Sequence, residues 1–118
     1  MIELLKERFT RDRQAVYDRC ERILHRLLEH KEVFERYPDL RRVILFGSFA
    51  LRRAREDSDV DVYVEGLGAR EYWELWAGLE DLLGSSVDLH DEKDGLDIEW
   101  IEREGILIYE RGICNSKS

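Results

Sequence analysis

The segment from residue 43 to residue 65 constrains the fold of this chain more than any other. An uninterrupted apolar run, Val43 to Phe46, ends in a glycine and a serine, as expected for a strand that is buried on both faces and followed by a tight turn. A second strand is predicted over Asp59 to Glu65, because three valines alternate there with other residues. Side chains alternate sides along a strand, so the valines share one face. The other face carries Asp59, Asp61, Tyr63 and Glu65.

Helical periodicity dominates both flanks of this pair of strands. Apolar residues recur at three- and four-residue steps from about Arg13 to Tyr37, and Pro38 is expected to end that helix. Residues 1–9 are expected to form a short leading helix or an extension of the same one. A second helix is predicted over Ala69 to Leu83. The remaining predicted elements are strands over 86–90 and 106–109 and a helix over 96–103, which together make an α/β (α+β) chain.

A pattern of small and acidic residues lies between the two central strands. Gly47 and Ser48 are followed, after nine residues, by Ser58, Asp59 and Asp61 in the arrangement Ser-Asp-x-Asp. Two aspartates at positions i and i+2 of one strand face project together. With a third carboxylate from a neighbouring strand they form a cage of oxygen ligands, which suits a hard divalent ion such as Mg²⁺.

The glycine and serine that open this pattern are candidates to bind phosphate. Gly47 lets the backbone approach a phosphate closely, and Ser48 offers a hydroxyl at the start of a short predicted helix, residues 48–53, whose N-terminal amides attract anions. Arg52, Arg53 and Arg55 follow and are candidates to add positive charge near the same site. We therefore expect the β- and γ-phosphates of a nucleotide to bind here.

The pattern from Gly47-Ser48 to Asp59-Val60-Asp61 resembles the minimal nucleotidyltransferase (MNT) family, within the nucleotidyltransferase superfamily that has a DNA polymerase β-like catalytic fold. The resemblance continues through residues 87–89, which are similar to the strand that supplies the third carboxylate, and through residues 103–110, which are similar to the C-terminal ending. It covers roughly residues 41–111. It implies a polymerase β-like nucleotidyltransferase fold, a small mixed sheet with helices packed on one face, to which this chain adds a long N-terminal helix.

The resemblance implies a role for each matching residue. The expected catalytic carboxylates and metal ligands are Asp59, Asp61 and Asp88, with two Mg²⁺ ions and ATP as the substrate. Asp88 is also expected to position or deprotonate the acceptor hydroxyl. The expected nucleotide-binding residues are Gly47, Ser48, Arg52, Arg53 and Ser58. The family usually has Arg where Leu51 stands and Gly where Arg52 stands, so phosphate contacts are expected to differ at these two positions.

Two assignments on the later elements stay open at this point. Asp91 and Asp94 are alternatives to Asp88 as the third carboxylate, and the strand register favours Asp88. His90 shares the face of Asp88 and is interpreted as an ordinary surface histidine. The aromatic residues of the second helix are interpreted as core residues rather than as a platform for base stacking; they are Tyr72, Trp73 and Trp76.

Charge and cysteine content limit the partners and the compartment. The chain has 27 acidic against 19 basic side chains, a formal net charge of -8, which argues against non-specific nucleic-acid binding because that binding depends on Lys and Arg. No stretch approaches membrane-spanning length, and the N-terminus lacks the apolar run of a signal peptide. Cys20 and Cys114 match no metal-ligand spacing, so reduced thiols in a cytoplasmic protein are expected.

The domain organisation points to a partner. We expect a single domain over residues 1–118, with an N-terminal helical extension (1–38), a catalytic core (41–111) and a flexible tail (112–118). Transferases of this superfamily usually carry a further domain that binds the acceptor, and none is expected here. The resemblance therefore implies an antitoxin of a HEPN/MNT toxin–antitoxin pair, which transfers AMP from ATP to a hydroxyl, a tyrosine, of a HEPN ribonuclease toxin. The alternatives are a small-molecule or RNA nucleotidyltransferase that needs another chain, and a non-catalytic module that binds the toxin.

The long N-terminal helix independently suggests an interface. At 1.5 Å per residue, some 25 helical residues extend about 37 Å, which is longer than a small domain is wide. We expect part of the helix to contribute to a toxin interface or a homo-oligomer. A monomer that covers the whole apolar stripe would count against this expectation; the stripe is Ile23, Leu24, Leu27 and Leu28.

Overall fold

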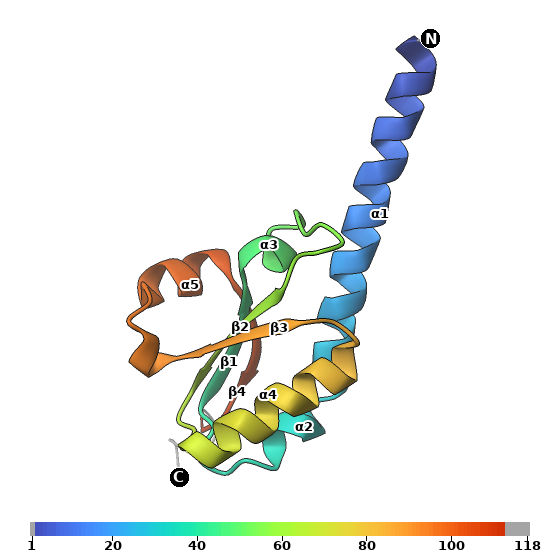
Figure 1. The fold of residues 1–118 in the computed structure, drawn as a ribbon. Helices are drawn as coiled ribbons and strands as arrows, with labels where there is room; N and C mark the ends of the chain where they lie inside the picture. The colour runs from blue at the N-terminus through green and yellow to red at the C-terminus, as the bar shows by residue number, and fades with distance from the viewer. Residues whose placement is uncertain (1, 113–118) are drawn as a thin grey trace.

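The structure, a computed structural model, describes residues 2–112, with side chains described at Lys6 and over residues 11–112. The elements in chain order are α1 (Ile2–Glu29), α2 (Glu32–Glu35), β1 (Arg42–Phe46), α3 (Gly47–Ala50), β2 (Val60–Glu65), α4 (Ala69–Leu83), β3 (Val87–Asp91), the 3₁₀ turn η1 (Glu92–Asp94), α5 (Ile98–Glu104) and β4 (Ile106–Glu110) (Figure 1). The predicted tail lies outside the described residues from residue 113 onward.

The four strands form one mixed sheet in the order β3-β2-β1-β4. Strand β1 runs antiparallel to both β2 and β4, whereas β2 and β3 are parallel. The register aligns Phe46 of β1 with Asp61 of β2, and Asp61 with Asp88 of β3. The mixed sheet expected from the sequence is confirmed, and its register brings acidic residues of two neighbouring strands to the same level.

The two faces of the sheet are covered unequally. The three valines of β2 point to one face, where α1, α2 and α4 pack and the main hydrophobic core forms. The opposite face, which we call the α5 face, carries a small second core of Ile44, Phe46 and Tyr63 against Ile101 of α5. The alternation read from the sequence is therefore confirmed. Helices cover one face of the sheet, as expected. In addition, α5 covers part of the α5 face and leaves the part that carries the acidic residues open.

The N-terminal helix differs in detail from its prediction. Residues 2–9 extend the main helix, as one of the two expectations had it, but α1 ends at Glu29 and α2 follows after a two-residue turn. This break lets Phe34 and Tyr37 reach the core, where 0% and 7% of their surfaces remain exposed. The helix predicted over residues 48–53 is also shorter, since α3 ends at Ala50.

Helix α1 projects beyond the sheet and the helices packed on it (Figure 1). With α1 included, the molecule measures 62 × 28 × 28 Å. Its apolar stripe, however, is mostly used within the chain: Ile23, Leu24 and Leu27 are buried, and only Leu28, with 37% of its surface exposed, is partly open. Because Leu28 is not covered, the stripe is not wholly used within the chain, and an interface formed by this helix, with a toxin or with a second copy, stays a prediction. No helix among the described residues is long and apolar enough to cross a membrane.

Side chains of α4 occupy the outer edge of β3. The indole Nε1 of Trp76 donates to the carbonyl of Val87 at 2.7 Å, the hydroxyl of Tyr72 donates to the carbonyl of Leu89, and a carboxylate oxygen of Glu80 accepts from the amide of Val87 at 3.0 Å. These contacts keep Tyr72 and Trp76 packed against the core, as expected. The expectation for Trp73 was wrong: 62% of its surface is exposed, and its ring stacks on Trp76 with centroids 5.2 Å apart.

Candidate functional site

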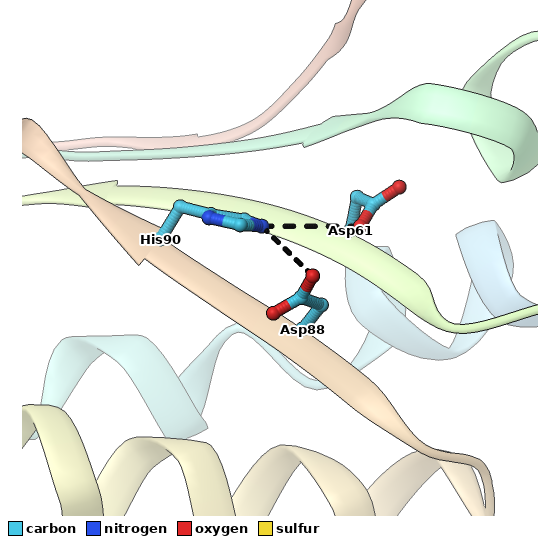
Figure 2. A group of neighbouring side chains, drawn as sticks. All are labelled: Asp61, Asp88 and His90. Atoms are coloured by element: carbon cyan, nitrogen blue, oxygen red, sulfur yellow. Dashed lines mark ion pairs between the residues drawn. The ribbon is translucent and has the colours of Figure 1, made fainter. Parts of the chain in front are cut away.

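The parallel register of β2 and β3 assembles an acidic cluster on the α5 face. Asp61 and Asp88 are partners in the register, and His90 lies two residues after Asp88 on the same face. The Nε2 atom of His90 is 3.2 Å from Oδ2 of Asp88 and 3.9 Å from Oδ1 of Asp61 (Figure 2). One ligand atom from each of these residues lies within 4.8 Å of the other two. Two strands thus bring two carboxylates and one imidazole to a single point.

Negative charge accumulates around Asp61. Burial raises the pKa of the Asp61 carboxyl, the charges of Asp88 and Asp59 raise it further, and His90 opposes this rise. Asp59 itself is exposed just before β2 begins. The cluster favours a bound cation, because a positive charge would offset the repulsion between the carboxylates.

Gly47 shapes the site by having no side chain. Its φ is +75°, in the left-handed region, and a Cβ atom built on it would lie 2.3 Å from Oδ2 of Asp61. The sequence indicated that this glycine lets a phosphate approach the backbone; in the structure the group that already lies against it is the Asp61 carboxylate. Ser48 follows in α3 and is partly exposed beside it. The turn after β1 therefore brings Gly47 against the acidic cluster and Ser48 next to it.

The predicted nucleotide-binding residues of the following loop have other contacts in the structure. Arg52 adopts a φ of +61°, and its Nε donates to a carboxylate oxygen of Glu21 in α1 at 2.8 Å. A left-handed backbone here agrees with the glycine that the MNT family usually has at this position. Ser58 accepts a hydrogen bond from the amide of Arg55 at 2.8 Å, and Arg53 is exposed. Binding of phosphate by these residues stays a prediction.

The structure separates the three candidates for the third carboxylate. Asp91 is buried, with 8% of its surface exposed, and its side chain accepts from the amide of Lys93 to cap η1. Asp94 accepts from the amide of Asp91 at 3.1 Å and also lies 3.5 Å from Nδ1 of His90. Asp88 alone among the three stands in register with Asp61, which supports the assignment that the strand alternation favoured.

The interpretation of His90 as an ordinary surface histidine was wrong. Its side chain is 22% exposed, its ring centroid lies 5.5 Å from that of Phe46, and it contacts carboxylates through both ring nitrogens. The signal was present in the sequence, since residues two apart on a strand share a face. A single histidine on a strand face is usually not part of a functional site, so the sequence pattern alone did not identify His90 as a site residue.

The donor set fits a divalent cation. Asp61 and Asp88 offer carboxylate oxygens on adjacent strands, and Asp59, two residues before Asp61, is exposed. Carboxylate oxygens are the ligands that Mg²⁺ takes in proteins, usually one or two of them together with phosphate oxygens and water. Among the described residues, the structure brings together Asp61, Asp88 and His90 as possible metal ligands, whereas Asp59 is exposed outside that group and its part in metal binding stays a prediction.

Comparison with known proteins agrees with this geometry. Residues 29–113 match the family model described as polymerase beta, nucleotidyltransferase. A relative from Methanocaldococcus jannaschii, provisionally named a protein adenylyltransferase, is 36% identical over 66 residues, which cover 53% of this chain and 67% of the relative.

Two solved structures extend the comparison to the fold. A protein provisionally described as a minimal nucleotidyltransferase is 31% identical, with a TM-score of 0.51, over 85% of this chain and 92% of that one. A variant of the toxin–antitoxin pair MntA–HpeT matches with 25% identity and a TM-score of 0.50, over 74% of this chain and 73% of that one. The chain therefore belongs to the polymerase β nucleotidyltransferase family, and it is a nucleotidyltransferase of the minimal type.

Proposed function

We propose that this nucleotidyltransferase transfers AMP from ATP, with Mg²⁺, to a tyrosine hydroxyl of a HEPN ribonuclease toxin and acts as its antitoxin. The observation that carries the proposal is the placement of Asp61 and Asp88 side by side on an open part of the sheet, with Gly47 against Asp61. The name of the archaeal relative, a protein adenylyltransferase, supports AMP as the group transferred. The similarity to a toxin–antitoxin structure supports the choice of partner.

The reaction assigns a task to each part of the site. The acceptor oxygen attacks the α-phosphorus of ATP, a new P–O bond forms, and the bond to the bridging oxygen of the β-phosphate breaks, so that pyrophosphate leaves. We assign to Asp88 the acceptance of the hydroxyl proton, and the exposure of 46% of its side chain supports this role. Gly47 and Ser48 hold the β- and γ-phosphates through backbone amides and a hydroxyl.

Asp59, Asp61 and Asp88 would hold Mg²⁺, which supplies neutralising charge for the triphosphate and for the pyrophosphate that leaves. The fit rests on their oxygen donors and on the repulsion between these carboxylates, which a cation relieves. Without that charge, Asp61 would repel the α-phosphate instead of orienting it. Replacing the carboxylates by amides is therefore expected to remove transfer without unfolding the chain.

The exposure of the acidic cluster supports a protein acceptor. Asp59 is exposed and Asp88 is about half exposed, so the reacting point lies at the surface. A small molecule is normally bound in a concave pocket that covers most of its surface. A tyrosine that protrudes from another protein reaches such a surface site more readily, and the partner chain itself supplies most of the binding energy.

The test is the transfer of label from ATP labelled at the α-phosphate to a purified HEPN ribonuclease from the same organism. Wild type with Mg²⁺ is expected to label the ribonuclease and abolish its activity, and digestion followed by mass spectrometry identifies the acceptor tyrosine. The Asp59→Asn, Asp61→Asn double variant is expected to bind the ribonuclease without labelling it. If wild type binds the ribonuclease and blocks it without labelling it, neutralisation occurs by contact alone and the proposal of catalysis fails.

A further inference from the structure

His90 has contacts that the proposed reaction does not use. Its Nε2 faces Asp88 at 3.2 Å and Asp61 at 3.9 Å (Figure 2). Its Nδ1 faces Asp94 at 3.5 Å. The ring is held between these carboxylates and Phe46, whose centroid is 5.5 Å away. In metal sites, one nitrogen of a histidine ring binds the metal and the other commonly contacts a carboxylate that orients the ring. His90 has this arrangement, because its Nε2 faces two potential metal ligands and its Nδ1 faces a carboxylate outside the cluster.

The separations between the ligand atoms also suit one shared ion. Bonds of about 2.1 Å to an octahedral ion place adjacent ligand atoms about 3 Å apart and opposite ones about 4.2 Å apart. The 3.2 Å from Nε2 to Oδ2 of Asp88 is close to the spacing of adjacent ligands, and the 3.9 Å from Nε2 to Oδ1 of Asp61 is closer to the spacing of opposite ligands. The cluster therefore needs little rearrangement to bind an ion through one nitrogen and two oxygens.

We infer that His90 is a nitrogen ligand of the divalent ion in this site, and that Asp94 orients its ring. A nitrogen ligand changes which ion binds best. Mg²⁺ is hard and takes oxygen ligands, whereas imidazole favours first-row transition ions. The site therefore binds Mn²⁺ and Co²⁺ more tightly, relative to Mg²⁺, than three carboxylates alone would. The inference rests on the proposed function only for the roles of Asp61 and Asp88 as metal ligands.

The test is binding of Mn²⁺ to the purified chain, followed by electron paramagnetic resonance. The resonance signal of free Mn²⁺ measures how much of the ion stays unbound and so gives the affinity. The pulsed electron spin echo signal of bound Mn²⁺ detects a directly coordinated ¹⁴N nucleus. Wild type is expected to show nitrogen coupling, which His90→Gln and His90→Ala lose together with about tenfold or more of the affinity for Mn²⁺. Their affinity for Mg²⁺ is expected to fall less.

Two controls separate this result from other causes. His25→Gln removes an imidazole whose side chain is 62% exposed on α1 and is expected to leave the nitrogen signal intact. Asp61→Asn is expected to weaken the binding of Mn²⁺ at the cluster and so distinguishes it from the many other surface carboxylates. Circular dichroism of each variant confirms that the fold is retained.

The outcomes distinguish this inference from the proposed function. If bound Mn²⁺ shows no nitrogen coupling in wild type, or if His90→Ala binds Mn²⁺ as wild type does, His90 is an ion-pair partner and the inference is wrong, even where AMP transfer occurs. If nitrogen coupling is present and lost in the His90 variants while no AMP is transferred to the ribonuclease, the inference holds and the proposed acceptor is wrong.

Discussion

Replacing Gly47 by alanine is expected to disable the site by displacing Asp61. A Cβ atom at residue 47 would lie 2.3 Å from Oδ2 and 3.1 Å from Cγ of Asp61. An ordinary contact between carbon and oxygen is about 3.4 Å or longer, so the carboxylate has to move by about 1 Å. The backbone adds a second penalty, because φ is +75° there and alanine avoids that region.

The two penalties have different sizes and different readouts. The left-handed conformation costs an alanine about 1–2 kcal/mol of unfolding free energy. A misplacement of about 1 Å at a reacting centre costs about 100-fold in rate, equivalent to about 2.7 kcal/mol. Gly47→Ala is therefore expected to lose roughly 100-fold in AMP transfer and about 2 kcal/mol or more of stability.

Gly84 provides a matched control for the backbone penalty. Its φ is +64°, similar to that of Gly47, but a Cβ atom built there meets no atom within 4 Å. Urea unfolding should show that Gly84→Ala loses about 1 kcal/mol, and the transfer assay should show unchanged activity. In an Asp61→Ala background the Oδ2 and Cγ atoms are gone and only the contact with Cβ at 3.2 Å remains, so Gly47→Ala should then cost less stability than it does with Asp61 present. Wild-type activity in Gly47→Ala, or an equal cost in both backgrounds, would refute this reasoning.

Three further predictions concern other contacts. Burial disfavours the Glu65 carboxylate, but hydrogen bonds from Arg42 and Tyr63 outweigh burial and lower its pKa. Glu65→Gln should therefore lose about 1.5–3 kcal/mol of unfolding free energy near neutral pH. The loss should shrink as pH falls through the lowered pKa, and urea unfolding at several pH values measures it. Arg52→Gly should be more stable than Arg52→Ala by about 1 kcal/mol, because both lose the contact with Glu21 but only glycine accepts the φ of +61°; equal melting temperatures would contradict this. Tyr72→Phe should cost about 1 kcal/mol in thermal unfolding by leaving a carbonyl of β3 without its donor, and a neutral result would mean that water replaces the hydroxyl.

The parts of the fold that the sequence predicted well are those governed by local periodicity. Alternation with a period of two placed Asp61 on the face opposite the valines of β2, and the burial of these valines in the main core bears this out. The boundaries of α4 agree with the prediction because Gly84 takes the left-handed conformation that ends a helix. Neither conclusion required knowledge of contacts between distant residues.

The parts that the sequence did not predict depend on tertiary contacts. Apolar residues keep helical spacing on both sides of residues 30–31, so periodicity does not predict the break between α1 and α2. The break depends on the packing of Phe34 into the core, which only the structure shows. Helical spacing groups Trp73 with its aromatic neighbours, but it does not say that Trp73 projects outward. The role of His90 requires its distance to Asp61, which lies on another strand.

The side chains of α4 that bond to the outer edge of β3 limit how copies of this chain can associate. Tyr72, Trp76 and Glu80 occupy backbone groups through which a further strand would pair with β3. At the opposite end of the sheet, β4 is the last strand among the described residues. Association through added strands is therefore confined to the β4 side. Two copies joined there would present the β3 edges outward, where the amide and carbonyl of Val87 and the carbonyl of Leu89 are already bonded, and this disfavours growth into a fibre.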